Sequence, residues 1–155
     1  MRTFSTTLGS SLGIILLSIG LHQCSAEKTI QYFDESDEIV VLEYGESKRG
    51  IISHLTIGYN RNISDSRCPI DLQCFWEGMA EIEIWIQPED EEIHFLTLPI
   101  YGHVTRTDTF RHVTLDTLGY TLALLELNPY PVYENAFSEG EYEAVIYIST
   151  ENGEK

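Results

Sequence analysis

Residues 79–87 read MAEIEIWIQ, and this stretch decides the fold class. Apolar residues occupy every second position, and acidic residues and a tryptophan stand between them: Ala80, Ile82, Ile84 and Ile86 against Glu81, Glu83 and Trp85. A period of two places alternate side chains on opposite faces of a β-strand. The stretch therefore predicts a strand with one buried face.

Similar short runs follow along the chain, separated by glycine, proline, asparagine or aspartate. They are rich in β-branched and aromatic residues and lie at 39–44, 51–59, 92–99, 110–116, 120–128 and 142–149. The run YTLALLELN (120–128) is apolar on both faces and predicts a central or fully covered strand. About seven antiparallel strands at this spacing predict an all-β protein, a single β-sandwich of Greek-key, immunoglobulin-like architecture.

The length of 155 residues predicts one domain, preceded by a targeting segment. Arg2 is the only charged residue before Glu27, and the apolar run LGIILLSIGL (12–21) is too short to span a membrane. This layout is that of a secretory signal peptide. We therefore expect a signal peptide at 1–26, a tether or weak first strand at 27–37, and the β-sandwich domain at 38–155.

Two alternatives exist for the processing of the signal peptide. Cleavage after Ala26 would remove Cys24, whereas lipidation would make Cys24 the first residue of the mature chain. Leu21 fits a lipidation motif, but Gln23 does not, because the residue before the cysteine should be small. Either alternative predicts an exported protein, periplasmic or secreted, and the second adds a membrane attachment through the lipid on Cys24.

The formal net charge of −16 limits the classes of partner. It argues against nucleic acid, whose phosphates would repel the protein, and against electrostatic binding to anionic lipid. It is compatible with a cation, a basic partner or a generic acidic surface. Hydrophobic residues make up 43% of the chain, so we expect a folded domain rather than an acidic disordered tail.

Cys68 and Cys74 lie in DSRCPIDLQCFWEG (65–78) and have five residues between them. In an exported chain such an even pair predicts a disulfide. The spacing differs from that of redox motifs, and no paired histidine motif accompanies it to form a zinc site. The bridge is too local to join two sheets, so we interpret it as a structural staple, with an exposed functional loop as the alternative.

The segment 65–82 resembles the Asp-Ser-Arg-Cys-Pro, Cys-x-Trp-x-Gly-x-Ala segment of a group of small, uncharacterised exported bacterial proteins, many of them predicted lipoproteins. GYTLALLELNPYP (119–131), followed by YEAVIYIS (142–149), is similar to the second recognisable segment of that group. The resemblance covers most of the mature chain. It implies export, with or without a lipid anchor, and implies no particular activity.

Two residues are candidates for binding. Arg67, if exposed beside the disulfide, could act as the reactive residue of a protease inhibitor; alternatively Asp65 caps the turn or pairs with Arg67, while Trp76 packs on the disulfide. Trp85 should point outward, where it could bind a glycan or protein, with Tyr147 on a neighbouring strand, or be covered by a loop or by the tether.

Neither a catalytic motif nor a metal-ligand spacing is recognisable. The acidic runs DESDE and PEDEE do not form a Ca²⁺-binding EF-hand loop. We therefore expect no cofactor, and predict a non-enzymatic binding module for an unknown protein or glycan. The alternatives are a protease inhibitor that uses Arg67 and an enzyme whose site assembles only in three dimensions.

Overall fold

The computed structural model describes residues 37–89, 91–108 and 111–150. This part of the chain contains strands β1 (Asp37–Glu43), β2 (Ser47–Arg49), β3 (Thr56–Asp65), β4 (Met79–Gln87), β5 (His94–Tyr101), β6 (Thr114–Thr117), β7 (Tyr120–Asn128) and β8 (Glu143–Thr150), with one short 3-10 helix, η1 (Glu139–Glu141). The leader at 1–26, with Cys24, and residues 27–36 of the expected tether lie outside the described residues. Within the described ranges no helix is long and apolar enough to cross a membrane.

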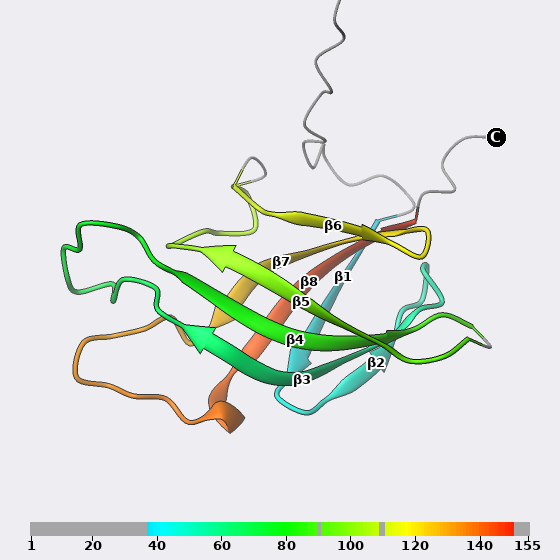
Figure 1. Ribbon diagram of the computed structural model, residues 1–155, viewed down its shortest axis with the longest axis horizontal. Helices are drawn as coiled ribbons and strands as arrows, with labels where there is room; N and C mark the ends of the chain where they lie inside the picture. Colours follow the sequence, from blue (N-terminus) through cyan, green and yellow to red (C-terminus); the bar gives the residue numbers. More distant parts are fainter. Residues whose placement is uncertain (1–36, 90, 109–110, 151–155) are drawn as a thin grey trace, which may run out of the picture.

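The strands form two four-stranded antiparallel sheets, in the orders β1-β8-β7-β6 and β2-β3-β4-β5. Figure 1 shows the second sheet in front of the first. The prediction of an all-β, two-sheet sandwich is confirmed. The Greek-key and immunoglobulin-like assignments stay predictions.

Two of the predicted strands match the structure from end to end, namely those at 79–87 and 120–128. The strand predicted at 51–59 begins only at Thr56, because the chain first makes a turn in which His54 has a φ of 54°. The short strand β2 was not predicted, since all three of its residues are exposed and carry no apolar alternation.

The core lies between the two sheets and is built by the alternating residues of the facing strands. Its largest fully buried side chains are Tyr59, Leu42, Leu55, Ile57, Ile82, Ile84, Ile86, Leu98, Leu122, Leu124, Leu127 and Ile146. Burial of side chains of this size stabilises the fold by roughly 1.5–3 kcal/mol each. The inward face predicted for MAEIEIWIQ is the one that is buried.

Strand β7 is buried on both faces, as its sequence predicts. Leu122 and Leu124 belong to the core between the sheets, whereas Ala123 and Leu125 belong to a second buried cluster together with Val145 and Tyr147. β7 also lies inside its sheet, between β6 and β8. Because neither face of β7 meets solvent, both faces can carry apolar side chains.

The sandwich has two ends, which differ in what they carry. Asp37 pairs with Ser149 at one end, which we call the terminal pole, because β1 begins and β8 ends there. Glu43 pairs with Glu143 at the other end, which we call the loop pole. Since β1 spans seven residues, the two poles are about 20 Å apart along the strand.

Glu38 holds the turn before β3 against β1 at the terminal pole. Its carboxylate accepts hydrogen bonds from the Ile51 backbone N–H (2.7 Å), the Ser53 backbone N–H (3.3 Å) and the Ser53 hydroxyl (2.9 Å). Partial burial of the carboxylate opposes its ionisation, but these hydrogen bonds outweigh that effect, so the pKa of Glu38 is lowered. The ionised form is therefore stabilised by folding.

Replacing Glu38 by glutamine should lower the free energy of unfolding at pH 7 by about 1 kcal/mol, a value discounted for solvent screening. A lowered pKa in the folded state means that the stabilisation is complete above the unfolded value of 4.5 and is lost as the pH falls through the folded pKa. Urea unfolding at pH 7 and near pH 3 should thus show the difference between the two proteins shrinking in acid. Glu92→Gln, an equal change of charge in an exposed turn, is the control, and a pH-independent difference for Glu38→Gln would contradict the prediction.

Candidate functional site

The connection between β3 and β4, residues 66–78, forms a braced loop at the loop pole that we call the cysteine loop. Cys68 and Cys74 form a disulfide with an S–S distance of 2.07 Å, which confirms the predicted staple. The ladder between the two strands continues into the loop, where Ser66 donates to the Met79 carbonyl and Cys68 to the Glu77 carbonyl, both at 2.8 Å. On the chain-entropy model a ring this small removes about 2–2.5 kcal/mol of unfolded-state entropy.

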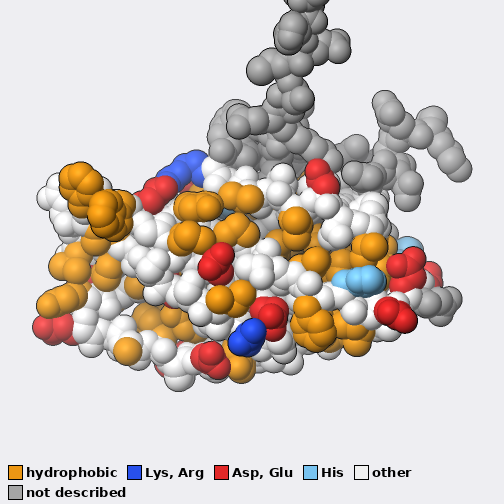
Figure 2. All heavy atoms as spheres, viewed as in Figure 1, with side chains coloured by type: hydrophobic (Ala, Val, Ile, Leu, Met, Phe, Trp, Pro, Cys, Tyr) orange, Lys and Arg blue, Asp and Glu red, His pale blue; other side chains and the backbone are white. Residues whose placement is uncertain are grey.

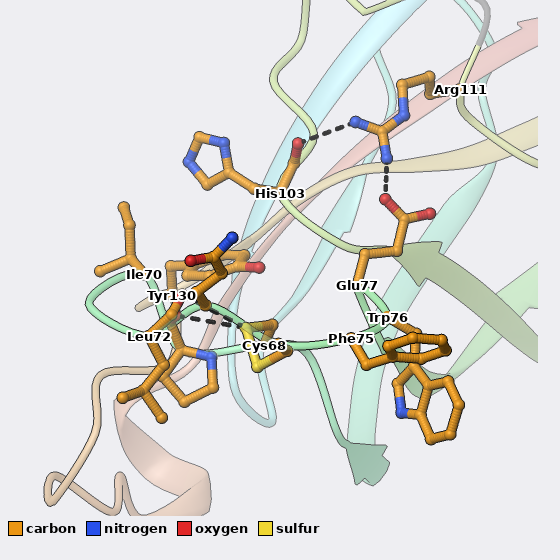
Figure 3. A pocket seen from close by; sticks show the side chains of 12 residues that line it. Cys68, Ile70, Leu72, Phe75, Trp76, Glu77, His103, Arg111 and Tyr130 are labelled. Carbon is orange, nitrogen blue, oxygen red and sulfur yellow. Dashed lines mark hydrogen bonds and ion pairs between the residues drawn. A yellow bond between two sulfur atoms is a disulfide. The ribbon is translucent and has the colours of Figure 1, made fainter.

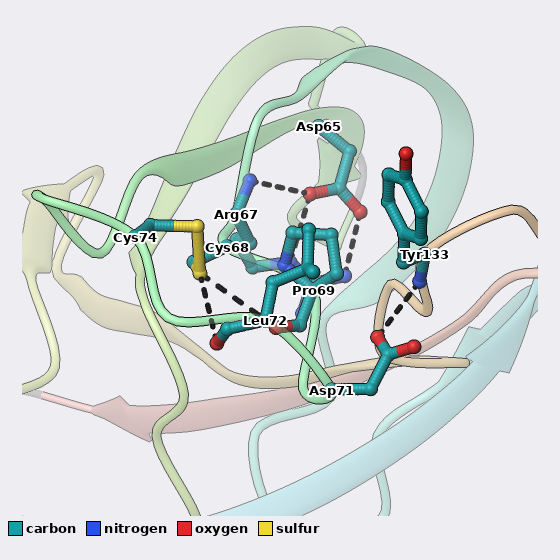
Figure 4. The surroundings of a disulfide bond; sticks show 8 residues. All are labelled: Asp65, Arg67, Cys68, Pro69, Asp71, Leu72, Cys74 and Tyr133. Carbon is teal, nitrogen blue, oxygen red and sulfur yellow. Dashed lines mark hydrogen bonds and ion pairs between the residues drawn. A yellow bond between two sulfur atoms is a disulfide. The ribbon is translucent and has the colours of Figure 1, made fainter.

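Arg67 is buried, so the interpretation of it as an exposed inhibitor residue is wrong. Only 2% of its side chain is exposed, and its guanidinium donates to both carboxylate oxygens of Asp65, at 2.9 and 2.7 Å. The Arg67 backbone N–H also donates to Asp65, at 3.2 Å. The alternative prediction, in which Asp65 pairs with Arg67, is confirmed (Figure 4).

The same arginine joins the cysteine loop to the opposite sheet. It donates to the Leu127 carbonyl at 2.8 Å, and its guanidinium lies 4.7 Å from the centre of the Tyr130 ring. Asp65 in turn accepts a hydrogen bond from the Tyr142 hydroxyl at 3.3 Å. Burial and the neighbouring Asp65 charge raise the pKa of Tyr142, so its hydroxyl stays a donor. This network holds the base of the loop to both sheets.

A second connection, residues 129–142, runs beside the cysteine loop. Ile70 donates its backbone N–H to the Pro131 carbonyl at 3.0 Å, and Tyr133 donates its backbone N–H to Asp71 at 2.8 Å. Figure 4 shows the second of these bonds. The loop is therefore supported along its side as well as at its base.

The tip of the cysteine loop exposes two adjacent aromatic residues. Phe75 is 95% exposed and Trp76 is 75% exposed, and their rings meet edge to face with centres 5.2 Å apart. The prediction that Trp76 packs on the disulfide is wrong, since most of this side chain faces solvent. Hydrophobic side chains gather at this end of the molecule (Figure 2, left). We call Phe75 and Trp76 the aromatic tip.

A pocket of about 430 Å³ lies beside the aromatic tip. Its lining includes the disulfide, Ile70, Leu72, Tyr130, His103 and the ion pair of Glu77 with Arg111. Figure 3 shows Ile70, Leu72 and Tyr130 on one side of Cys68, with Phe75 and Trp76 on the other. The pocket is thus lined by apolar side chains of the loop on one side and by the polar groups of Glu77, His103 and Arg111 on the other.

The wall of the pocket formed by residues 102–108 and 111–113 is held in place by hydrogen bonds and ring contacts. The His103 ring meets the Tyr130 ring edge to face at 4.9 Å, and Arg111 donates to the His103 carbonyl at 3.3 Å. The ring nitrogens of His112 lie 3.2 Å from the Leu124 carbonyl and 3.0 Å from the Thr105 carbonyl. His112 therefore serves to attach this wall to β7.

Trp85 has a structural role that its sequence position did not reveal. It lies opposite Gly58 on the outer face of β4 and is half-buried, and a Cβ atom placed on Gly58 would lie 2.2 Å from the Trp85 ring. The ring thus covers the place where Gly58 lacks a side chain. The suggested pairing with Tyr147 is wrong, because Tyr147 is buried in the other sheet.

The structure therefore separates the two predicted binding residues from the exposed site. Arg67 is buried at the base of the cysteine loop, Trp85 packs on the sheet, and the aromatic tip is formed by Phe75 and Trp76. The spacing of Cys68 and Cys74 identifies the loop that carries the exposed site, but no periodic pattern within the loop indicates which of its side chains face solvent. The contributions of Tyr130, His103 and Arg111 come from distant parts of the chain.

Within the described ranges, no three His, Cys, Asp or Glu side chains are grouped so that they could hold a metal ion. Comparison of the chain with family models, with curated proteins and with solved structures found no match. The resemblance of residues 65–82 to a group of exported bacterial proteins stays a prediction. The function has to be inferred from the geometry of the loop pole.

Proposed function

We propose that this protein is an exported, non-enzymatic binding module that docks a protein partner, in the cell envelope or after secretion, through its cysteine loop. The observation that carries the proposal is the aromatic tip. Phe75 and Trp76 are 95% and 75% exposed on a loop that a disulfide, a buried ion pair and a neighbouring connection all hold in place. Side chains this exposed bury almost no apolar surface within the domain, so they contribute little to its stability.

Rigid presentation of aromatic side chains is a feature of strong protein interfaces. Tryptophan is enriched among the few residues that dominate binding energy, and such residues fill pockets on the partner. A loop already ordered in the free protein loses less conformational entropy on binding. The cysteine loop has both properties, with Trp76 exposed and the bracing in place before any partner arrives.

The shape of the aromatic tip favours a protein over a glycan. The planes of Phe75 and Trp76 lie 84° apart, so the two rings do not form one flat surface on which a sugar could stack. Trp85, the other candidate for a glycan, has its ring against Gly58. Two perpendicular rings that project from a loop suit a cavity in a partner, beside which the pocket can receive a side chain in return.

The position of the two ends of the described chain also supports a role in binding. The described chain begins at Asp37 and its last described strand ends at Thr150, both at the terminal pole. The cysteine loop lies at the opposite pole, where the Tyr142 hydroxyl meets Asp65. Attachment through the N-terminal side, for example by a lipid on Cys24, would therefore leave the aromatic tip free to meet a partner.

The proposal is tested by placing a photo-crosslinking amino acid at Gln73, within the loop, and identifying the protein captured in the cell envelope or medium. The captured partner is then purified and its affinity measured. We expect Trp76→Ala to weaken binding by about 30-fold, equivalent to the roughly 2 kcal/mol of a dominant interface residue. The melting temperature should be unchanged, because Trp76 is exposed.

Phe95→Ala is the matched control, because Phe95 is another aromatic residue, 61% exposed, on the outer side of the sandwich near the terminal pole. It should leave the affinity unchanged. Equal affinity of the wild type and Trp76→Ala, or equal weakening by Phe95→Ala, would contradict docking through the cysteine loop.

A further inference from the structure

Two loops at the loop pole carry exposed carboxylates next to exposed apolar residues of the same loop. Asp71 lies between Ile70 and Leu72 in the cysteine loop, and Glu134 follows Tyr133 in the 129–142 connection. The Tyr133 backbone N–H donates to Asp71, which places these two segments in contact. Among the described residues, neither carboxylate forms an ion pair.

The cations that belong to this pole are already engaged. Arg67 is buried against Asp65, Arg111 is paired with Glu77 at the wall of the pocket, and Arg106 of the same wall is paired with Glu126. None of these arginines is therefore left to neutralise Asp71 or Glu134. The pole presents apolar side chains flanked by negative charge, on a chain whose net charge is −16.

We infer that the partner docked by the cysteine loop presents a cationic, amphipathic polypeptide surface, with an apolar centre that receives the aromatic tip and lysine or arginine side chains around it. This inference rests on the proposed function and names the class of its partner. The apolar contacts supply affinity, while the opposite charges steer the encounter and raise the association rate. An acidic polypeptide would meet Asp71 and Glu134 with like charge.

The probes are two synthetic 18-residue amphipathic peptides with the same leucine face, one with lysine and the other with glutamate on the polar face. The full mature protein is attached to a sensor surface through its N-terminal side, at the terminal pole. We expect the lysine peptide to bind, with an association rate that falls about 10-fold when NaCl is raised from about 50 to 500 mM. The glutamate peptide should show no binding at the same concentrations.

Variants locate the effect. The double variant Asp71→Asn/Glu134→Gln should lower the association rate of the lysine peptide by about 5-fold, and Trp76→Ala should raise its Kd by about 10-fold or more. Glu91→Gln/Glu92→Gln makes the same change of net charge in the β4–β5 turn, at the terminal pole, and should change the rate less than about 2-fold.

Three results would overturn the inference: equal binding of the glutamate peptide, no binding of the lysine peptide, or an equal loss of rate in the terminal-pole variant. None of these results would contradict the proposed function, which is tested by the affinity of the captured partner for the wild type and for Trp76→Ala. Conversely, equal affinity of that partner for the two proteins would contradict the proposed function, independently of the peptide results.

Discussion

Replacing Arg67 by methionine should lower the free energy of unfolding by about 3–5 kcal/mol, because it leaves the carboxylate of Asp65 buried without its cation. The guanidinium makes two bonds to Asp65 and one to the Leu127 carbonyl, and lies against the Tyr130 ring. Methionine retains much of the apolar volume, so the loss reports the charge and the hydrogen bonds. Urea unfolding monitored by tryptophan fluorescence measures it.

Arg61→Met is the matched control for this prediction. Arg61 also pairs with a carboxylate, that of Glu83 at 3.0 Å, but 58% of its side chain is exposed. Exposed ion pairs contribute at most about 1 kcal/mol, so this variant should remain close to the wild type. A loss in Arg67→Met no larger than that in Arg61→Met would show that the buried network does not stabilise the fold.

Replacing Gly78 by alanine should lower the free energy of unfolding by about 3 kcal/mol, for two separate reasons. Gly78 has a φ of +70°, which costs a residue with a Cβ about 1–2 kcal/mol. The added Cβ would also lie 2.0 Å from the Ser66 carbonyl oxygen, which is backbone and cannot rotate away. Separating the two segments would weaken the hydrogen bonds of Ser66 and Cys68 at the base of the loop, each of which contributes about 1 kcal/mol.

Gly45→Ala separates the two reasons. Gly45 has a φ of +76° but nothing within 4 Å of an added Cβ. Its substitution should cost only the conformational part, about 1–2 kcal/mol. The difference between the two variants, measured by urea unfolding, is the cost of the contact with Ser66. If both variants lose the same free energy of unfolding, the close approach of Gly78 to Ser66 does not contribute to the cost of the substitution.

Short-range patterns in the sequence were reliable guides to the strands. The alternation in MAEIEIWIQ predicts the bounds and the buried face of β4, because successive side chains of a strand point alternately into the core and away from it. The two-sided apolar character of YTLALLELN likewise predicts the central position of β7. Strand β2 escaped the prediction because its residues are exposed on both faces.

The functional assignments needed information that no single segment contains. Arg67 could equally be free or paired on sequence grounds, and its burial depends on Leu127, Tyr130 and Tyr142, which lie far along the chain. Trp85 looks like a ligand-binding residue until Gly58 on the neighbouring strand is seen beneath its ring. Whether a side chain is exposed depends on the residues packed around it, and for Arg67 and Trp85 those residues lie on other segments of the chain.

By itself, the sequence determined the all-β class, the inward faces of its strands and the disulfide between Cys68 and Cys74. These features depend on residues that are close together in the sequence, where alternation and spacing can be read directly. Only the tertiary structure decided that Arg67 is internal, that Phe75 and Trp76 are outward, and that the Tyr133 backbone meets Asp71, so that two distant loops lie in contact. Those outcomes depend on packing between segments brought together by the two sheets. The physical reason is that burial and charge pairing are set by contacts in space, which a linear pattern does not record.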